Sequence, residues 1–518
     1  MRFAGMSLVL LTLTSALAAQ EPTADELLRA VERKLVAVNE TAGPSVACVV
    51  VSRSEKYPKP TSDAPGSLGG FDAKQLLLDN PKANERLAKA LDLSDHRNIP
   101  DHGFACGLVI DDKGFVLTPH HVVEGATKIY VHLPGRVGSY ADIHAADARH
   151  DLAVLRLLTP PPGLKAVRFA DARGLRSVAA GKLVVIAENG YTANLPVDRP
   201  AAVLGSITRV RPHLDDSVGD KRQKLSSHSY YYHGPFIEYS ATLKPPRPGA
   251  PDLAPPAWAA SGAALLTLDG ELIGLTTTAP ILGHGDKTPG YTFPMDENVR
   301  RVIDVLRRGE EVEYGFLGVQ LDDSRGEIGL GLVLPLGPAA QAGVRTGDVI
   351  THINDVPVKS YPDLLVHIGS ALAGTKVQLT LRRGANQTIP VPLVLGKLQH
   401  DRPVIASARP APVFGLRVEY DSILAQLVSN NAQAILENVD KGIPVGVSVR
   451  DVATDSPAAT AFKKLGDRPE RWLVTHLNGN AVTSPAEFYA AAKGQKSIKL
   501  TVIDPTEAKR PQREVTFP

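Results

Sequence analysis

The chain has 518 residues, of which 57 are basic and 55 acidic, so its formal net charge is only +2. This balance, together with 43% apolar residues, excludes a largely disordered chain and argues against a protein held to nucleic acid by a basic surface. At about 100–200 residues per domain, the length allows about three or four domains. The 44 glycines and 41 prolines, beside only 5% aromatic residues, favour many short strands joined by turns.

The chain begins with the pattern of an export signal. Arg2 gives a positive start, the run from Ser7 to Ala19 is apolar or small, and Ala16-Leu17-Ala18 offers a small-x-small cleavage pattern. We therefore expect a signal peptide over residues 1–18 and an exported chain, periplasmic or secreted. Contact with a membrane is expected only if the signal stays uncleaved and acts as an anchor.

The two cysteines, Cys48 and Cys106, both lie in strand-like runs. Since an exported chain meets an oxidising compartment, a single disulfide is chemically allowed, and two buried thiols are an equally good interpretation.

After the signal, residues 19–44 contain apolar residues at helical spacing over about 24–38, which predicts an amphipathic helix. The pattern then changes to short β-rich runs separated by Gly, Asp and Pro turns, at 45–52, 105–110, 115–118, 128–133, 152–157 and 182–187. Such punctuation predicts an all-β sandwich or barrel region over residues 45–309. A helix over 297–309 closes this region.

Two polar segments interrupt the β-rich region, near 53–102 and near 212–257. The first contains a predicted helix within 73–93, and the second is rich in proline and contains three consecutive tyrosines, Tyr230 to Tyr232. We expect both to be insertions that form surface loops.

The remaining sequence contains an internal repeat, over residues 313–397 (the first repeat) and 411–518 (the second repeat). Both copies contain S/G-P-A-A, a Gly-Asp pair, a [VI]-T-H-[IL]-N run and a helix opening near a proline. Because the period is about 90–100 residues, the repeat indicates two similar domains.

Three segments of the β-rich region carry residues suited to acyl-transfer hydrolysis. A histidine pair follows a strand in 115–125, an aspartate opens an apolar strand in 148–157, and a serine lies in a small-residue turn in 259–275. Such hydrolysis needs a hydroxyl nucleophile, an imidazole base and a buried carboxylate that orients the imidazole. Small neighbours of the serine let backbone N–H groups approach the developing oxyanion.

The order of these residues and the flanking motifs resemble the HtrA/Deg family of serine proteases. FVLTPHHVVEGA resembles the family's histidine motif, HDLAVLRL its aspartate motif and SGAALLTLDGELIGL its serine motif. The resemblance covers nearly all of the mature chain. It implies a mainly β fold, with a chymotrypsin-like double β-barrel over residues 45–309 followed by two α+β PDZ-like domains over 313–397 and 411–518.

Carried over residue by residue, the resemblance makes His121 the general base, since the family histidine directly precedes Val-Val. Asp151 would orient it, Ser261 would be the nucleophile, and the backbone N–H groups of Ser261 and Ala259 would form the oxyanion hole. His120 is then expected to be a surface residue or a neighbour of the site.

The serine motif departs from the family's G-N-S-G-G, because it reads Ala259-Ala260-Ser261-Gly262-Ala263 here. An L-residue with positive φ at the first position would cost about 1 kcal/mol or more. Two hypotheses therefore stay open: an ATP-independent endopeptidase that degrades unfolded or misfolded proteins, and a weak or inactive relative that serves as a PDZ scaffold or chaperone.

The resemblance also implies that Phe316, Leu317, Gly318 and Val319 form the peptide-binding loop of the first repeat, while Phe414-Gly415-Leu416 is a looser match in the second. PDZ domains add a peptide as a strand to a sheet edge. The partners implied are unfolded substrates and C-terminal peptides, with assembly into a homotrimer or larger. No nucleic acid, cofactor or metal is expected.

Overall fold

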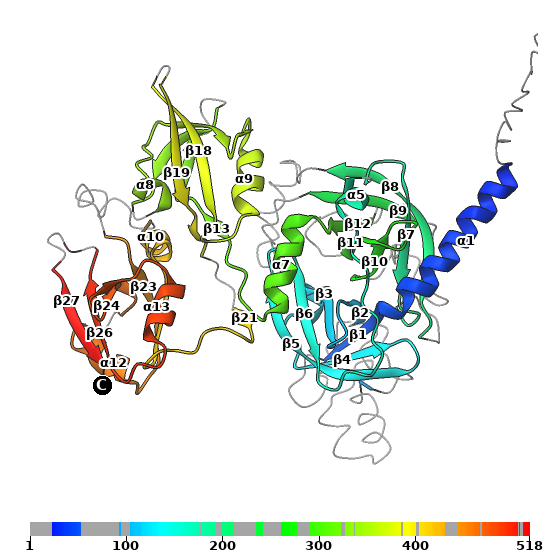
Figure 1. Ribbon diagram of the computed structural model, residues 1–518, viewed down its shortest axis with the longest axis horizontal. Coiled ribbons are helices and arrows are strands. Elements are labelled where there is room, and N and C mark those ends of the chain that lie inside the picture. Colours follow the sequence, from blue (N-terminus) through cyan, green and yellow to red (C-terminus); the bar gives the residue numbers. More distant parts are fainter. Residues whose placement is uncertain are drawn as a thin grey trace, which may run out of the picture.

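The structure is a computed structural model (Figure 1). It describes residues 23–52, 93–94, 104–176, 178–192, 198–211, 235–241, 261–277, 290–322, 327–335, 337–384, 387–399, 404–429, 444–466, 469–505, 507 and 511–517. The signal peptide at 1–18, nearly all of 53–102 with its predicted helix, the three tyrosines and Ala259 lie outside these residues. Among those described, no helix is long and apolar enough to cross a membrane.

The predicted N-terminal helix is present as α1 (Ala24–Ala42). Thr23 caps its first turn in a capping box with Glu26, which satisfies backbone N–H groups that the helix itself leaves unpaired. Val38 is buried, whereas Leu27 and Leu28 near the start are exposed. The helix therefore packs through its C-terminal half, which contacts strands of the second barrel, and its N-terminal half projects from the domain (Figure 1).

Six strands form a first barrel. They are β1 (Val46–Ser52), β2 (Phe104–Val109), β3 (Phe115–Pro119), β4 (Lys128–Leu133), β5 (Val137–Asp147) and β6 (Leu152–Leu157). Their order is β5-β4-β1-β2-β3-β6, and the pairing of β5 with β6 closes the barrel. A short strand from the connection between the repeats, β21 (Ile405–Ala406), adds to the free side of β5.

A second closed barrel follows. It is built from β7 (Leu183–Glu188), β8 (Ala201–Arg211), β9 (Phe236–Ala241), β10 (Ala264–Leu266), β11 (Leu272–Thr277) and β12 (Gly290–Pro294). Strand β9 lies within 212–257, so part of the expected insertion is a barrel strand. Its FIEYSA sequence places Phe236, Ile237 and Tyr239 in the interior, where they are nearly inaccessible to solvent.

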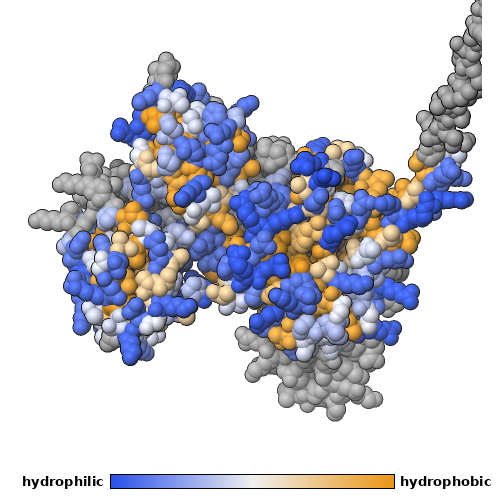
Figure 2. Space-filling view, viewed as in Figure 1, coloured by the Kyte–Doolittle hydropathy of each residue, from blue (hydrophilic) through white to orange (hydrophobic). Residues whose placement is uncertain are grey.

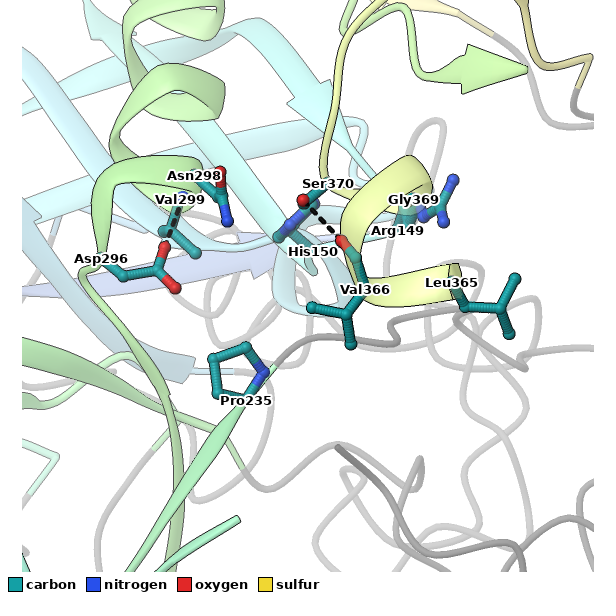
Figure 3. Close-up of a pocket in the computed structure, with 10 residues that line it drawn as sticks. All are labelled: Arg149, His150, Pro235, Asp296, Asn298, Val299, Leu365, Val366, Gly369 and Ser370. Carbon is teal, nitrogen blue, oxygen red and sulfur yellow. Dashed lines mark hydrogen bonds between the residues drawn. The ribbon is translucent and has the colours of Figure 1, made fainter. Parts of the chain in front are cut away.

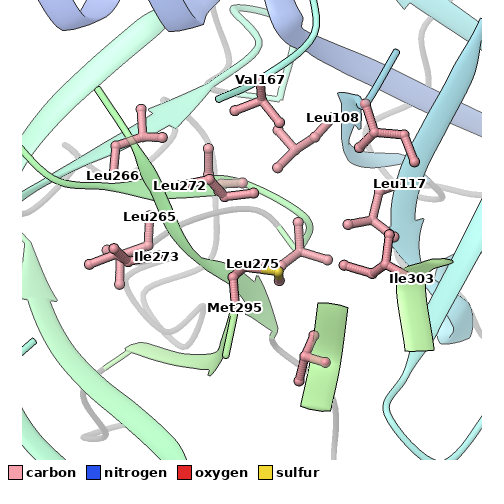
Figure 4. Close-up of a cluster of buried hydrophobic side chains, with 14 of the residues drawn as sticks. Leu108, Leu117, Val167, Leu265, Leu266, Leu272, Ile273, Leu275, Met295 and Ile303 are labelled. Atoms are coloured by element: carbon pink, nitrogen blue, oxygen red, sulfur yellow. The ribbon is translucent and has the colours of Figure 1, made fainter. Parts of the chain in front are cut away.

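One buried apolar cluster spans both barrels. Leu108 and Leu117 from the first barrel lie in the same buried cluster as Leu272, Leu275 and Met295 from the second (Figure 4). Helix α7 (Glu297–Arg307) closes this core with a buried apolar face, while its outer face appears hydrophilic in Figure 2. The short helix α5 (Ala172–Arg176) lies between the barrels in sequence.

Each repeat folds into a sheet of the same topology. The first contains β14 (Val319–Asp322), β15 (Gly329–Val333), β16 (Val349–Ile353), β17 (Val356–Pro357), β18 (Lys376–Arg383) and β19 (Gln387–Val394), with α8 (Pro338–Gln341) and α9 (Tyr361–Gly369). The second contains β22 (Leu416–Tyr420), β23 (Val447–Val452), β24 (Leu473–Leu477), β25 (Asn480–Ala481), β26 (Ile498–Ile503) and β27 (Arg513–Phe517), with α10 (Asp421–Ser429), α12 (Pro457–Lys463) and α13 (Pro485–Ala492). The orders β14-β15-β16-β18-β19 and β22-β23-β24-β26-β27 correspond strand by strand.

The repeated T-H-[IL]-N run has the same structural role in both copies. Thr351 and Thr475 donate hydrogen bonds to the carbonyls of Thr380 and Thr501, across to the neighbouring strand. The asparagine that follows takes a left-handed conformation, φ 47° at Asn354 and 49° in the second copy, and turns the chain into a short hairpin. The predicted fold class, a double barrel followed by two α+β domains, is therefore confirmed.

A buried ion cluster, which we call the Lys397 cluster, joins the repeats. Strand β20 (Gly396–Lys397) pairs with β13 (Gly315–Phe316) at the base of the first repeat. The Lys397 ammonium lies 2.7 Å from Glu311, 3.2 Å from Glu313 and 2.9 Å from Glu419 of the second repeat. Its side chain is 5% exposed, so these contacts replace most of its hydration.

Candidate active site

Strand register brings His121 and Asp151 together. His121 lies in the short helix α4 (His120–Val123), which directly follows β3, and Asp151 ends the turn between β5 and β6. Since Pro119 at the end of β3 pairs with Leu152 at the start of β6, the residues just beyond that pair are neighbours. Sequence positions 30 residues apart thus meet at one rim of the first barrel.

The pair has the geometry of an oriented base. The Nδ1 atom of His121 lies 2.7 Å from Oδ2 of Asp151, and Oδ1 of Asp151 accepts the His121 backbone N–H at 2.8 Å. A carboxylate only accepts hydrogen bonds, so Nδ1 carries the proton and Nε2 is left to accept one. The Asp151 side chain is fully buried, whereas that of His121 is 22% exposed, as access by a substrate requires.

Thr277 of β11 adds a third contact to the carboxylate, because its hydroxyl donates to Oδ2 of Asp151 at 3.3 Å. The neighbouring Thr276 bonds the turn that holds Ser261: its carbonyl accepts the Gly262 N–H at 2.8 Å and its hydroxyl accepts the Ala263 N–H at 2.9 Å. One strand of the second barrel therefore connects the serine turn to the aspartate of the first barrel.

Ser261 itself is fixed against the first barrel. Its carbonyl accepts the backbone N–H of Cys106 in β2 at 2.8 Å, and the residue is only 7% exposed. Gly262 lies against Pro119, which is two residues before His121, so the serine turn and the histidine helix adjoin at the junction of the barrels. Of the two expected oxyanion residues, Ser261 is described and Ala259 lies outside the described residues.

Gly262 has no room for a side chain. Its φ is +83°, and a Cβ atom added there would stand 2.1 Å from the carbonyl oxygen of Cys106. Relieving that contact would shift Ser261, and a displacement of about 1 Å can lower the rate by about 100-fold. We therefore expect Gly262→Ala to lower kcat/KM about 100-fold on a peptide substrate.

Gly181→Ala is the matched control, because Gly181 has a φ of +84° but nothing within 4 Å of the added atom. It carries the same conformational cost without the clash, and its kcat/KM should stay within about twofold of the native value. Equal losses in the two variants would show that close packing of the serine turn is not what matters.

His120 is not a surface residue, since it is only 5% exposed. Its backbone N–H donates to the carbonyl of Asp151 at 2.9 Å, so its position beside the site agrees with the other half of the expectation. No cluster of three or more potential ligands for a metal ion occurs within the described residues.

The expected peptide-binding loop runs from the end of β13 to the start of the edge strand β14 in the first repeat. Gly318 has a φ of +82°, and its carbonyl and that of Leu317 accept hydrogen bonds from Leu334 and Ala339. The Leu317 side chain is buried in the repeat's own core, whereas Phe316 and Val319 are partly exposed. The loop is thus held from within, and its first and last side chains reach the surface.

The second repeat differs at the corresponding edge. The backbone N–H of Val418 in β22 donates to the hydroxyl of Tyr489 at 3.2 Å, and Tyr489 comes from α13. An added peptide strand would need such edge groups for its own hydrogen bonds. This contact favours the first repeat as the peptide-binding copy.

Both cysteines are free and fully buried, and they face each other in register across β1 and β2. Burial raises the pKa of the Cys48 thiol well above its ordinary value, with a further contribution from Cys106. The buried-thiol interpretation thus describes this structure.

Two known protein families match this chain, in the same order as the double barrel and the first repeat. A trypsin-like peptidase domain matches residues 105–275, and a PDZ domain matches residues 315–393. A probable periplasmic serine endoprotease DegP-like from Pseudomonas fulva (strain 12-X) is 26% identical over 488 residues, which cover 90% of each chain. The periplasmic serine endoprotease DegP of Escherichia coli (strain K12) is 28% identical over 405 residues, covering 76% of this chain and 72% of the relative.

Among solved structures, the HtrA-type protease AlgW with tripeptide aligns with a TM-score of 0.46 and 17% identity, over 71% of this chain and 98% of that one. The matched domains lie within the double barrel and the first repeat, and the relatives extend the match along most of the chain. The chain is therefore a serine endopeptidase, and its trypsin-like and PDZ domains together with these relatives support an HtrA/Deg family protease.

Proposed function

We propose that this endopeptidase degrades unfolded or misfolded proteins in the periplasm without ATP, and that its PDZ domain recruits their C-terminal segments. In this proposal Ser261 is the nucleophile, His121 the general base and Asp151 the residue that orients His121. The observation that carries it is the 2.7 Å contact between Nδ1 of His121 and the buried Asp151 carboxylate.

The proposed reaction begins when His121 Nε2 takes the Ser261 hydroxyl proton as the oxygen attacks a peptide carbonyl. Asp151 stabilises the imidazolium that forms, and the imidazolium then protonates the leaving amine. Water hydrolyses the acyl-enzyme by the same steps. Backbone N–H groups of Ser261 and Ala259 are the proposed donors to the oxyanion.

An extended substrate fits this arrangement better than a folded one. A catalytic histidine with a side chain only 22% exposed and a serine residue 7% exposed require a strand-like segment to reach them. β14 is an edge strand, which suits the addition of a peptide strand through Phe316 to Val319. The relatives are named periplasmic, and the export signal predicted at residues 1–18 supports the same location here.

The test compares the mature chain with Ser261→Ala on casein and on a stably folded protein, without ATP. We expect the native chain to cut casein and spare the folded protein, and Ser261→Ala to cut neither. Equal cleavage by Ser261→Ala would contradict the assigned nucleophile. Binding of casein without cleavage by the native chain would favour the scaffold or chaperone hypothesis.

A further inference from the structure

A second buried polar cluster lies at the turn between β5 and β6, which ends at the proposed catalytic Asp151. The Asp147 Oδ2 atom accepts the His150 backbone N–H at 3.0 Å and lies 3.1 Å from His150 Nδ1. The Tyr314 hydroxyl donates to the same oxygen and lies 2.5 Å from His150 Nδ1. All three residues are at most 7% exposed, so water contributes little to this arrangement.

Two members of the cluster, Asp147 and His150, belong to the turn that ends at Asp151. Asp147 ends β5, Leu152 starts β6, and the turn between them includes His150 and finishes at Asp151. Asp151 has a φ of +53°, a left-handed conformation that costs about 1–2 kcal/mol for a residue other than glycine. A conformation of this kind persists where surrounding contacts impose it.

Tyr314 comes from outside the turn and outside the barrels. It lies at the start of the first repeat, directly before β13, and its carbonyl accepts the backbone N–H of Leu398, which directly follows β20, at 2.8 Å. Its ring stacks on His150 at 5.5 Å between centroids, and the Arg149 guanidinium lies 4.5 Å from the ring centroid. One side chain therefore contacts each of the two residues that precede Asp151.

The first repeat also packs against this turn. Arg149 and His150 line a small cleft together with Val366, Gly369 and Ser370 of the α9 end (Figure 3). The Arg149 side chain packs against Gly369. A Cβ atom added to Gly369 would stand 2.7 Å from the Nη2 atom of Arg149. The turn is thus held between the barrel rim and the first repeat.

The charge state of the cluster agrees with its geometry. Burial by itself raises the pKa of Asp147, but the hydrogen bonds and charge of His150 and the hydroxyl of Tyr314 outweigh it and hold that pKa below its ordinary value. Asp147 is therefore an ionised acceptor, which strengthens the bonds it receives.

We propose that Tyr314 is a positioning residue for the hydrolytic reaction: its hydroxyl, acting through Asp147 and His150, fixes the turn that presents Asp151 to His121. It touches neither substrate nor reacting atoms. This inference rests on the proposed role of Asp151, and it adds the start of the first repeat to the parts of the chain that determine kcat.

Tyr314→Phe tests the proposal, because it keeps the ring and its stacking while it removes the hydroxyl. In the full mature chain we expect kcat on a short peptide substrate to fall about 10-fold with KM unchanged, since a misplaced aspartate impairs proton transfer and not binding. The rate of inactivation by phenylmethylsulfonyl fluoride, a small serine reagent, should fall by a similar factor. A role limited to docking the first repeat would leave that inactivation rate unchanged.

Tyr489→Phe is the matched control, since it removes a partly buried tyrosine hydroxyl from the second repeat, and it should have native rates. A native inactivation rate in Tyr314→Phe, or a change confined to KM, would overturn the inference. If Ser261→Ala is inactive while Tyr314→Phe is native, only this inference fails. If Ser261→Ala keeps full activity, the proposed function fails instead.

Discussion

Replacement of Asp151 by asparagine is expected to lower kcat by about 10⁴-fold while the fold is kept. Asparagine has the same size and can accept the His121 backbone N–H through its oxygen, as Oδ1 of Asp151 does at 2.8 Å. Its NH2 group would then face His121 Nδ1, and two donors cannot share a hydrogen bond. The imidazole would adopt the other tautomer or rotate, and Nε2 could no longer take the serine proton.

The measurement is kcat and KM for a peptide substrate, beside the melting temperature. Asp269→Asn serves as the control, because Asp269 is exposed and pairs with Lys34 on the surface. It should have native kinetics. A loss below about tenfold in Asp151→Asn would mean that another group orients His121.

Lys397→Met is expected to have the largest effect on stability. Methionine keeps most of the side-chain volume but leaves Glu311, Glu313 and Glu419 together without their central cation. Breaking a buried pair in this way costs about 3–5 kcal/mol, because acidic side chains that stay largely buried lose their central cation. The loss should appear in the unfolding of the two repeats, which the cluster joins.

This loss should depend on pH. Burial raises the pKa of Glu313 above its ordinary value, Lys397 opposes that rise, and Glu419 and Glu311 add to it. A raised folded-state pKa means that the folded chain holds a proton more readily, so stability from this group falls as pH rises through that pKa. Without Lys397 the pKa of Glu313 rises further. The destabilisation should therefore be greatest above about pH 7 and smaller at about pH 5.

Thermal unfolding of the native chain and of Lys397→Met, each measured above about pH 7 and at about pH 5, tests this dependence. Lys34→Met is the control, since Lys34 pairs with Asp269 on the surface with side chains 54% and 68% exposed. Exposed pairs contribute about 0–1 kcal/mol, so this variant should differ little from the native chain at either pH. Equal effects of the two substitutions would contradict a structural role for the Lys397 cluster.

Much of the fold could be predicted because its signals are local. The strands at β4 and β6 and the helix α7 have strong apolar patterns, and they begin and end close to the predicted residues. Strand β5 was harder to predict, because VGSYADIHAAD mixes small and polar residues and is stabilised by strands on both sides. Strand β9 was missed because its short FIEYSA run lies within a segment that is otherwise polar and rich in proline.

The candidate site divides in a similar way. His121, Asp151 and Ser261 stand in motifs whose residues are adjacent in sequence, so the sequence alone points to them. Thr277 and Tyr314 contact the site from distant segments and belong to no motif, and only the packing of barrels and repeat reveals them. The sequence also left open whether Cys48 and Cys106 are thiols or a disulfide. The structure places them in register across β1 and β2 as free thiols.

The most direct test is to find which residue reacts covalently with a fluorophosphonate. The mature native chain, incubated with the reagent and analysed by peptide mass spectrometry, should carry the adduct on Ser261, and His121→Ala should carry almost none. An unlabelled Ser261 in a chain that still cleaves casein, or an adduct on a different serine, would contradict the assignment of Ser261 as the nucleophile activated by His121 and Asp151.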